Sequence, residues 1–136
     1  MDLAAQLRRD EGSKNFPYRD TVGKLTIGVG RNLDDRGLTD SEIEVLLQND
    51  IANAASILKA RLPWFQSLDA VRQAVLVNMT FNMGYGKLAA FEKMLSAAAL
   101  GNFGEAANEM MNSTWAQQVG DRAIRLSMQM RSGEWQ

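Results

Sequence analysis

Residues 10–31 read DEGSKNFPYRDTVGKLTIGVGR, and this stretch decides the expected fold because a helical pattern changes to a strand pattern within it. On its N-terminal side, Leu3, Leu7 and Glu11 recur at the i, i+4, i+8 spacing of one helix face. Gly12 follows directly and is the usual kind of residue at a helix C-terminus. The sequence therefore predicts a helix over residues 2–11 that carries Glu11 on its apolar side.

After this helix the signals become those of a short β-hairpin over residues 16–30. Apolar residues alternate with polar residues and glycines, which is typical of strands bounded by turns. The stretch from Asp20 to Gly23 has the residue types of a tight turn. Thr26 lies in the strand that follows this turn.

Glu11, Asp20 and Thr26 are the candidate catalytic residues. Two carboxyl groups facing one cleft are typical of glycoside hydrolysis, in which one acts as an acid and the other activates water or stabilises the reacting centre. Each residue also has an ordinary reading: Glu11 as a surface carboxylate, Asp20 as a turn residue that binds its own backbone, and Thr26 as a β-branched strand former. The pattern alone favours the ordinary readings.

The remainder of the chain is predicted to be helical. Thr39 to Glu42 has the form of a capping box, and a long apolar face then continues to residue 61. Ser67 is expected to cap the next helix, which ends near Gly84 and has the broad apolar face of a buried central helix. Three further helices are expected over residues 88–100, 103–111 and 121–130, with residues 113–120 separating the last two.

Composition excludes several classes of function. The 136 residues fit one domain, and a net charge of −1 provides no basic surface for nucleic acid. There is no cysteine, no signal peptide is expected, and no apolar run is long enough to span a bilayer. The segment 32–37 resembles a calcium loop only faintly, because Arg36 and Ile43 occupy positions that require oxygen ligands. No metal or cofactor is therefore expected.

Three blocks of residues in order and spacing resemble the phage-type lysozymes, glycoside hydrolase family 24. The first block holds D-E-G at 10–12, Y-x-D-T-x-G at 18–23 and T-I-G-V-G at 26–30. The second is SLDAVRQAVLVNMTFNMG at 67–84, and the third contains Trp115, Arg122, Arg125 and the ending at 130–135. The resemblance covers nearly the whole chain.

The resemblance implies roles for individual residues. It makes Glu11 the general acid, Asp20 the residue that activates water or balances charge, and Thr26 the residue that places the water. It puts Phe81 and Asn82 in the sugar groove, and it pairs Arg122 and Arg125, as supporting residues, with Glu11 and Asp10. The implied substrate is bacterial peptidoglycan.

Two departures from the family pattern are visible. Only eight residues separate Gly30 from Thr39, where the best known member carries a much longer β-rich insertion. Arg31 stands where that member has histidine, and this chain contains no histidine. Since Asp50 occupies the position of the histidine's acidic partner, the resemblance predicts an Arg31–Asp50 ion pair.

The expected architecture is a mainly helical α+β, lysozyme-like fold in one domain, residues 1–136. It has a small β-hairpin lobe over about 12–60, a long connecting helix within it, and a helical C-terminal lobe over about 61–136 plus helix 1–11. The expected activity is that of a muramidase acting as a phage endolysin, a monomer held in the host cytoplasm before release to the wall, without stable membrane association. A lytic transglycosylase and a non-catalytic peptidoglycan-binding module are the alternatives.

Overall fold

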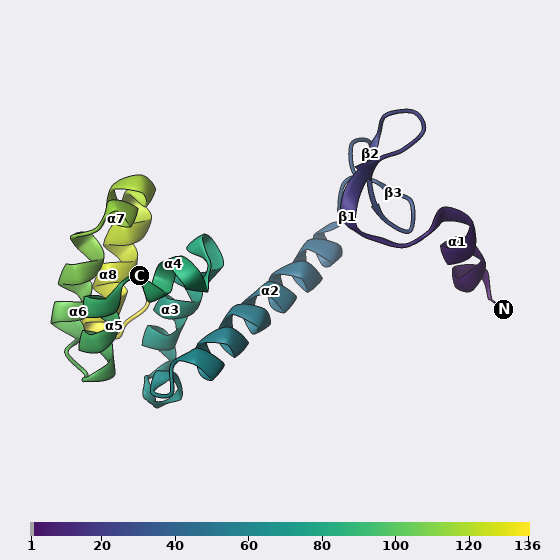
Figure 1. Ribbon diagram of the computed structural model, residues 1–136. Coiled ribbons are helices and arrows are strands. Elements are labelled where there is room, and N and C mark those ends of the chain that lie inside the picture. Colours follow the sequence, from purple (N-terminus) through teal and green to yellow (C-terminus); the bar gives the residue numbers. More distant parts are fainter. Residues whose placement is uncertain (1) are drawn as a thin grey trace. The chain divides into compact units, whose positions relative to one another are not determined.

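The computed structural model describes residues 2–136, in which helices predominate and one small antiparallel sheet follows the first helix (Figure 1). The expected mainly helical α+β class is thereby confirmed. The chain forms two compact units, Met1–Leu46 and Leu47–Gln136. Assignment of residues 1–11 to the C-terminal lobe stays a prediction.

Helix α1 (Leu3–Glu11) has both of its ends specified by single residues. At its start, the Asp2 carboxylate accepts a hydrogen bond of 2.8 Å from the backbone N–H of Ala5, which is the action of a helix N-cap. At its end, Gly12 has φ of 80°, a conformation that glycine adopts without steric cost. Glu11 is thus the last helical residue, as the sequence predicted.

The sheet of the first unit has three antiparallel strands in the order β1-β2-β3. Strands β1 (Lys14–Arg19) and β2 (Leu25–Gly28) form the expected hairpin, and β3 (Arg31–Asn32) adds a short third strand. Tyr18 pairs with Thr26 at the end of β1 that leads into the turn. The sheet therefore carries Thr26 on its central strand.

Strand β1 contains a bulge. Lys14 lies opposite Gly28, and Tyr18 lies opposite Thr26. Between these two pairs, β1 has the three residues 15–17, whereas β2 has only Ile27. Pro17, within the bulge, has no N–H to give to a partner strand. The ladder is consequently regular only where β1 approaches the turn.

Helix α2 (Asp40–Arg61) begins with the capping box that the sequence indicated. The Thr39 N–H donates to Glu42 Oε1 at 2.8 Å, and the Glu42 N–H donates to Thr39 Oγ1 at 3.2 Å. These reciprocal bonds satisfy two backbone donors that the first helical turn leaves without partners.

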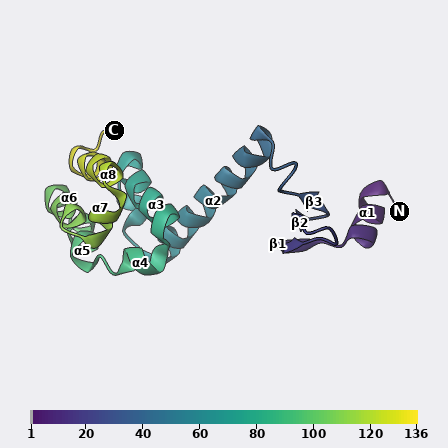
Figure 2. The same cartoon turned by 90° about the horizontal axis from the view of Figure 1, so that it is seen from above.

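Leu47–Gln136 forms a helical unit with a continuous apolar core. It contains η1 (Phe65–Ser67), α3 (Ala70–Met83), α4 (Tyr85–Ala89), α5 (Glu92–Ala99), α6 (Phe103–Met111), α7 (Thr114–Val119) and α8 (Asp121–Ser132). Helix α6 packs against both α5 and α8, and α8 also packs against α3 (Figure 2). Its largest fully buried side chains are Phe65, Leu58, Leu76, Met79, Leu88, Met94, Met110, Met130 and Val75.

The first unit, in contrast, has almost no buried side chains. Thr26, 3% exposed, is the one residue of the described range 2–46 that is classed as buried. Burial of apolar surface therefore contributes little to holding this sheet, and hydrogen bonds must fix its loops.

Three of the expected helix boundaries are wrong. The N-cap of α3 is Asp69, whose carboxylate accepts from the Arg72 N–H at 3.1 Å, while Ser67 ends the preceding 3-10 turn. The helix expected over 88–100 is divided into α4 and α5 before Phe91. The separating segment 113–120 is itself largely helical, because Ser113 caps α7 through the Ala116 N–H at 3.1 Å.

Arg31 pairs with Glu42 inside the first unit, a contact that the sequence did not predict, while the expected Arg31–Asp50 pair would join the two units and stays a prediction. Arg31 Nη2 lies 2.6 Å from Glu42 Oε2, and Arg31 Nη1 donates to Glu42 Oε1 at 2.8 Å. Arg31 Nη1 also donates to the Gly37 carbonyl at 3.1 Å. The arginine thus joins β3 to the start of α2, through a residue of the capping box.

This pairing predicts a loss of stability in acid. The hydrogen bond from Arg31, with those from Thr39, lowers the pKa of Glu42 from about 4.5 to about 2. A lowered folded-state pKa stabilises the fold above the unfolded value, and that stabilisation is lost as pH falls from about 4.5 toward about 2. Because arginine keeps its charge, nothing is lost as pH rises through neutrality.

We expect Glu42→Gln to flatten the acid side of the profile of melting temperature against pH between 7 and 2.5, compared with the wild type. Asp50→Asn is the matched comparison, since it removes one carboxylate of the same helix, the one that the family resemblance pairs with Arg31. A flattening in Asp50→Asn instead of Glu42→Gln would restore the pairing implied by the family resemblance.

Candidate active site

The three candidate catalytic residues all belong to the first unit. Glu11 ends α1, Asp20 directly follows β1, and Thr26 lies in β2, opposite Tyr18. The hairpin places Asp20 at its turn end, one pair beyond Arg19 and Leu25. The residues that the sequence singled out are therefore carried by one helix end and one hairpin.

The Glu11 side chain lies beside Gly30. A Cβ atom at position 30 would be 3.3 Å from Glu11 Oε2 and 3.4 Å from its carboxyl carbon. Gly30 also has φ of 68°, which disfavours any residue with a side chain. The glycine between β2 and β3 thus leaves room for the Glu11 carboxyl at the edge of the sheet. The apolar stripe that shares its helix face is exposed, with Leu3 67% and Leu7 43% exposed.

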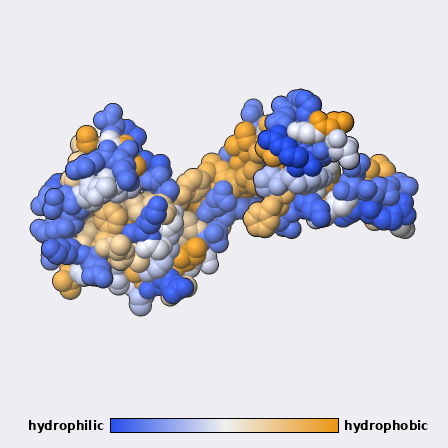
Figure 3. Space-filling model, turned by 45° about the horizontal axis from the view of Figure 1, so that its top comes forward, coloured by the Kyte–Doolittle hydropathy of each residue, from blue (hydrophilic) through white to orange (hydrophobic). Residues whose placement is uncertain are grey.

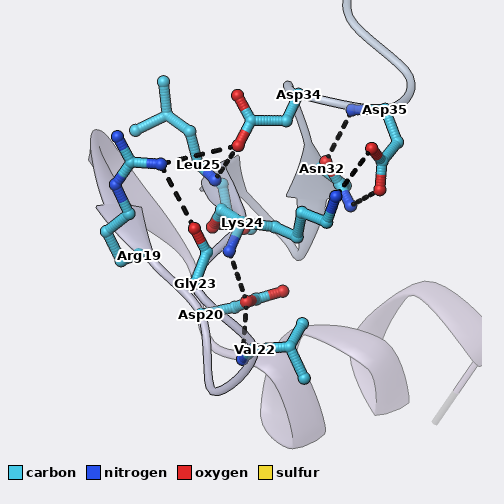
Figure 4. Close-up of polar contacts among 10 residues, drawn as sticks. Arg19, Asp20, Val22, Gly23, Lys24, Leu25, Asn32, Asp34 and Asp35 are labelled. Atoms are coloured by element: carbon cyan, nitrogen blue, oxygen red, sulfur yellow. Dashed lines mark hydrogen bonds and ion pairs between the residues drawn. The ribbon is translucent and has the colours of Figure 1, made fainter.

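One oxygen of the Asp20 carboxylate is engaged by its own turn. Oδ1 accepts from the N–H groups of Val22 at 2.9 Å and Lys24 at 2.8 Å (Figure 4). The backbone closes the same turn through Gly23 N–H to Asp20 O at 3.0 Å and Asp20 N–H to Lys24 O at 2.9 Å. Within residues 2–136, the hydrogen bonds to this carboxylate all fall on Oδ1, so the turn orients the carboxylate and leaves Oδ2 for another donor.

The Thr26 hydroxyl donates to the Lys24 carbonyl at 2.9 Å. A hydroxyl has one proton to donate and two lone pairs to accept, so this bond leaves Thr26 as an acceptor toward any further partner. The bond also ties Thr26 to Lys24, the residue whose N–H binds Asp20.

A second polar network surrounds the turn and was missed by sequence reasoning. Asp34 Oδ2 accepts from the Leu25 N–H at 2.8 Å and lies 3.5 Å from Arg19 Nη1. Lys24 Nζ donates to Asp35 Oδ1 at 3.0 Å, and this bond raises the pKa of Lys24 and lowers that of Asp35. The available signal was the Asn32-x-x-Asp35 spacing, in which Asn32 Oδ1 accepts from the Asp35 N–H at 3.0 Å.

The predicted groove residues Phe81 and Asn82 lie near the end of α3 and line different pockets of the helical unit. Asn82 lines a pocket of about 670 Å³, where its Oδ1 accepts from Trp115 Nε1 at 2.9 Å. Phe91 packs edge-on against Trp115 in the same pocket, with ring centroids 6.1 Å apart. The Asn82 amide group is thereby oriented, and its N–H donors remain for a ligand.

Phe81, 48% exposed, belongs to an apolar depression of about 530 Å³ that Val77 and Trp135 also line. Figure 3 shows that apolar side chains are exposed on the surface of the helical unit. Aromatic faces and amide groups are both suited to sugars, but these two neighbours do not share one pocket.

The supporting residues have other partners than those implied by the resemblance. Arg122 donates from Nε and Nη2 to Asn78 Oδ1 at 3.0 and 2.7 Å, and Arg125 lines a pocket of about 280 Å³ with Arg122. Asp10 accepts from its neighbour Arg9 at 3.0 Å. Pairing of the two arginines with Glu11 and Asp10 stays a prediction.

Within residues 2–136 there is no cluster of three or more metal-binding side chains of the His, Cys, Asp and Glu types. Likewise, none of the helices in this range has the length and apolar character needed to cross a membrane.

Comparison with known proteins identifies the family of this chain. The family model for phage lysozyme matches residues 8–132. The chain is 30% identical to probable T4-type lysozyme 1 of Dictyostelium discoideum, covering 93% of this chain and 92% of that protein. It is 29% identical to probable T4-type lysozyme 2 of the same organism, covering 96% and 94%.

A further relative is much longer. The chain is 30% identical to the pre-baseplate central spike protein Gp5 of Enterobacteria phage T4, with 98% of this chain aligned to 28% of that protein. The alignments to the spike protein and to lysozyme 1 extend over 161 and 156 residues, so both relatives carry residues that this 136-residue chain lacks. With a family model that spans both units and two lysozymes aligned over nearly their whole length, the chain belongs to the phage lysozyme family.

Proposed function

We propose that the protein is a muramidase that hydrolyses the β-1,4 bond between N-acetylmuramic acid and N-acetylglucosamine in peptidoglycan. The observation that carries the proposal is the polarity around Asp20 and Thr26. The backbone of the turn donates to Oδ1 of Asp20, and the Thr26 hydroxyl donates its proton to the Lys24 carbonyl. Oδ2 of Asp20 and Oγ1 of Thr26 therefore remain as hydrogen-bond acceptors. Acceptors are what a water molecule needs in order to be held by its protons.

In the proposed reaction, Glu11 gives its proton to the glycosidic oxygen as the bond to the anomeric carbon breaks. Water held by Asp20 and Thr26 adds to that carbon, and the proton that the water loses passes to Asp20. The reaction inverts the anomeric configuration in this scheme. The residues implied for the groove, Phe81 and Asn82, bind the sugar chain.

The biological role that we propose is lysis of a bacterial host by a phage or prophage. The enzyme is a monomer that acts on the wall after leaving the host cytoplasm, and it requires neither cofactor nor stable membrane association. The chain also matches a segment of the spike protein, so a domain of this kind can act within a larger protein as well.

A lytic transglycosylase would cut the same bond but would close an internal anhydro ring without using water. Thr26 and the free oxygen of Asp20 favour the hydrolase, since a transglycosylase needs no pair of acceptors for water.

The test is digestion of purified bacterial cell walls in water enriched in ¹⁸O, with turbidity and the masses of the released muropeptides as readouts. We expect clearing, with the new reducing ends heavier by one ¹⁸O atom. Unlabelled 1,6-anhydromuramic ends would establish the transglycosylase instead. Failure of the folded protein to clear walls that it nevertheless binds would establish the non-catalytic module.

A further inference from the structure

The short segment 32–35 lies against the turn that carries Asp20. Figure 4 shows the polar contacts that tie this segment to the hairpin, in a unit whose one buried residue within the described range 2–46 is Thr26. The Leu25 N–H donates to Asp34, while the side chains of Lys24 and Asn32 both donate to Asp35. The two aspartates therefore hold different parts of the neighbouring hairpin: Asp34 binds its backbone, and Asp35 binds a side chain.

Asp34 reaches both sides of the catalytic turn. Its Oδ2 receives the Leu25 N–H at 2.8 Å on the side that leaves the turn, and lies 3.5 Å from Arg19 Nη1 on the side that enters it. Arg19 Nη1 in turn donates to the Gly23 carbonyl at 3.2 Å, inside the turn. One carboxylate thus connects residues that directly precede and closely follow Asp20.

The orientation of the Asp20 carboxylate depends on the same backbone. Its two hydrogen bonds come from the N–H groups of Val22 and Lys24, and Lys24 immediately precedes the residue that Asp34 holds. A displacement of the strand at Leu25 would therefore move the Lys24 N–H and rotate the carboxylate.

We propose that Asp34 is a positioning residue for Asp20, acting through the turn at 20–24. The inference rests on the proposed function, since it assigns Asp20 to catalysis. The described residues 2–46 include only one buried residue, so the carboxylate of Asp34 fixes the turn by its bond to the Leu25 N–H and its ion pair with Arg19. The role proposed for Asp34 runs through the Leu25 N–H and Arg19 and requires no contact with the substrate.

The main test compares Asp34→Ala with Asp35→Ala on cell-wall substrate. Both variants remove one carboxylate from the same segment, but Asp35 binds the Lys24 and Asn32 side chains rather than the hairpin backbone. We expect Asp34→Ala to lower kcat about tenfold with KM within about twofold, since small misplacements of a reacting group are costly. Asp35→Ala should stay within about twofold of the wild type in both.

A conservative variant separates positioning from simple loss of charge. Asp34→Asn retains an oxygen that can accept from the Leu25 N–H, although it loses the ion pair with Arg19. It should recover most of the kcat that Asp34→Ala loses, because the exposed ion pair contributes little. A kcat for Asp34→Asn as low as that of Asp34→Ala would overturn the role assigned to the backbone bond.

Amide hydrogen exchange at Val22 and Lys24 provides a readout that needs no activity. Asp34→Ala should increase exchange at both amides, which Asp20 protects, while Asp35→Ala should leave both unchanged. Equal exchange at these amides in the two variants overturns the proposal whatever the activity of Asp34→Ala, and so does a rise that is no larger than the rise at the α1 amide of Ala5, since this indicates general unfolding. An inactive wild type would instead reject the proposed function, and the exchange comparison would still decide whether Asp34 fixes the turn.

Discussion

Glu11→Gln should lower the kcat for cell-wall hydrolysis by about 10³-fold, which is within the usual contribution of a general acid. Glutamine has nearly the shape of glutamate, so it fits beside Gly30 in the space that the glycine leaves. It has no acidic proton for the leaving oxygen. The melting temperature should therefore stay within a degree or two of the wild type while turnover is lost.

Glu105→Gln is the matched control for Glu11→Gln. It makes the same substitution at an exposed carboxylate in the first turn of α6, outside the candidate site. Its kcat should equal that of the wild type. If Glu11→Gln retained more than a tenth of wild-type kcat, Glu11 could not be the acid that protonates the glycosidic oxygen.

Asp20→Asn should lower kcat by about 10²-fold, because the amide cannot take the proton that the attacking water loses. The amide oxygen can still accept from the Val22 and Lys24 N–H groups, so the turn should be preserved. The predicted signature is a fall in kcat at nearly constant KM and constant melting temperature, measured on the same cell-wall substrate.

Asp20→Ala separates the role of the Asp20 charge in catalysis from the role of its hydrogen bonds in holding the turn. It removes the acceptor as well as the charge, and loss of hydrogen bonds to a charged group should destabilise the protein by about 1–2 kcal/mol. Denaturant unfolding of the two variants measures this difference. If Asp20→Asn unfolded as readily as Asp20→Ala and kept most of its activity, Asp20 would be a turn residue only.

Local patterns explain what could be predicted of the fold. The capping box of Thr39 and Glu42 forms as expected because its two hydrogen bonds join residues three apart. The turn at 20–23 was predictable for the same reason, since an aspartate binds the backbone a few residues later. Ser67 and Asp69 are both good caps, and only the 3-10 turn, which buries Phe65, makes Asp69 the residue that starts α3.

Contacts between residues farther apart in the sequence account for features that local patterns missed. The break before Phe91 has no glycine or proline to mark it, and Phe91 instead packs against Trp115, which is far along the chain. The Arg31–Glu42 pair was missed because the resemblance directed attention to Asp50, whereas Glu42 lies at the start of the helix that directly follows the short loop.

In the candidate site, too, the residues in local motifs could be predicted and a residue that acts through a more distant contact could not. Glu11, Asp20 and Thr26 could be found because their motifs are compact and each lies at a recognisable helix end, turn or strand. Asp34 could not, because its bond to the Leu25 N–H joins residues nine apart through a backbone donor that carries no sequence signature.

The bulge in β1 has a consequence for how the protein behaves at high concentration. A three-stranded sheet has two open edges, and unpaired edges of regular strands invite pairing with other molecules. Here one edge is β1, whose hydrogen-bond ladder is interrupted by the bulge at residues 15–17, which includes Pro17. The other edge is β3, which has only two residues. Neither edge strand therefore exposes a long, regular row of backbone N–H and C=O groups with which a strand of another molecule could pair. A lobe this small can thus expose its strands, including the 81% exposed side chain of Phe16, without offering a template for aggregation.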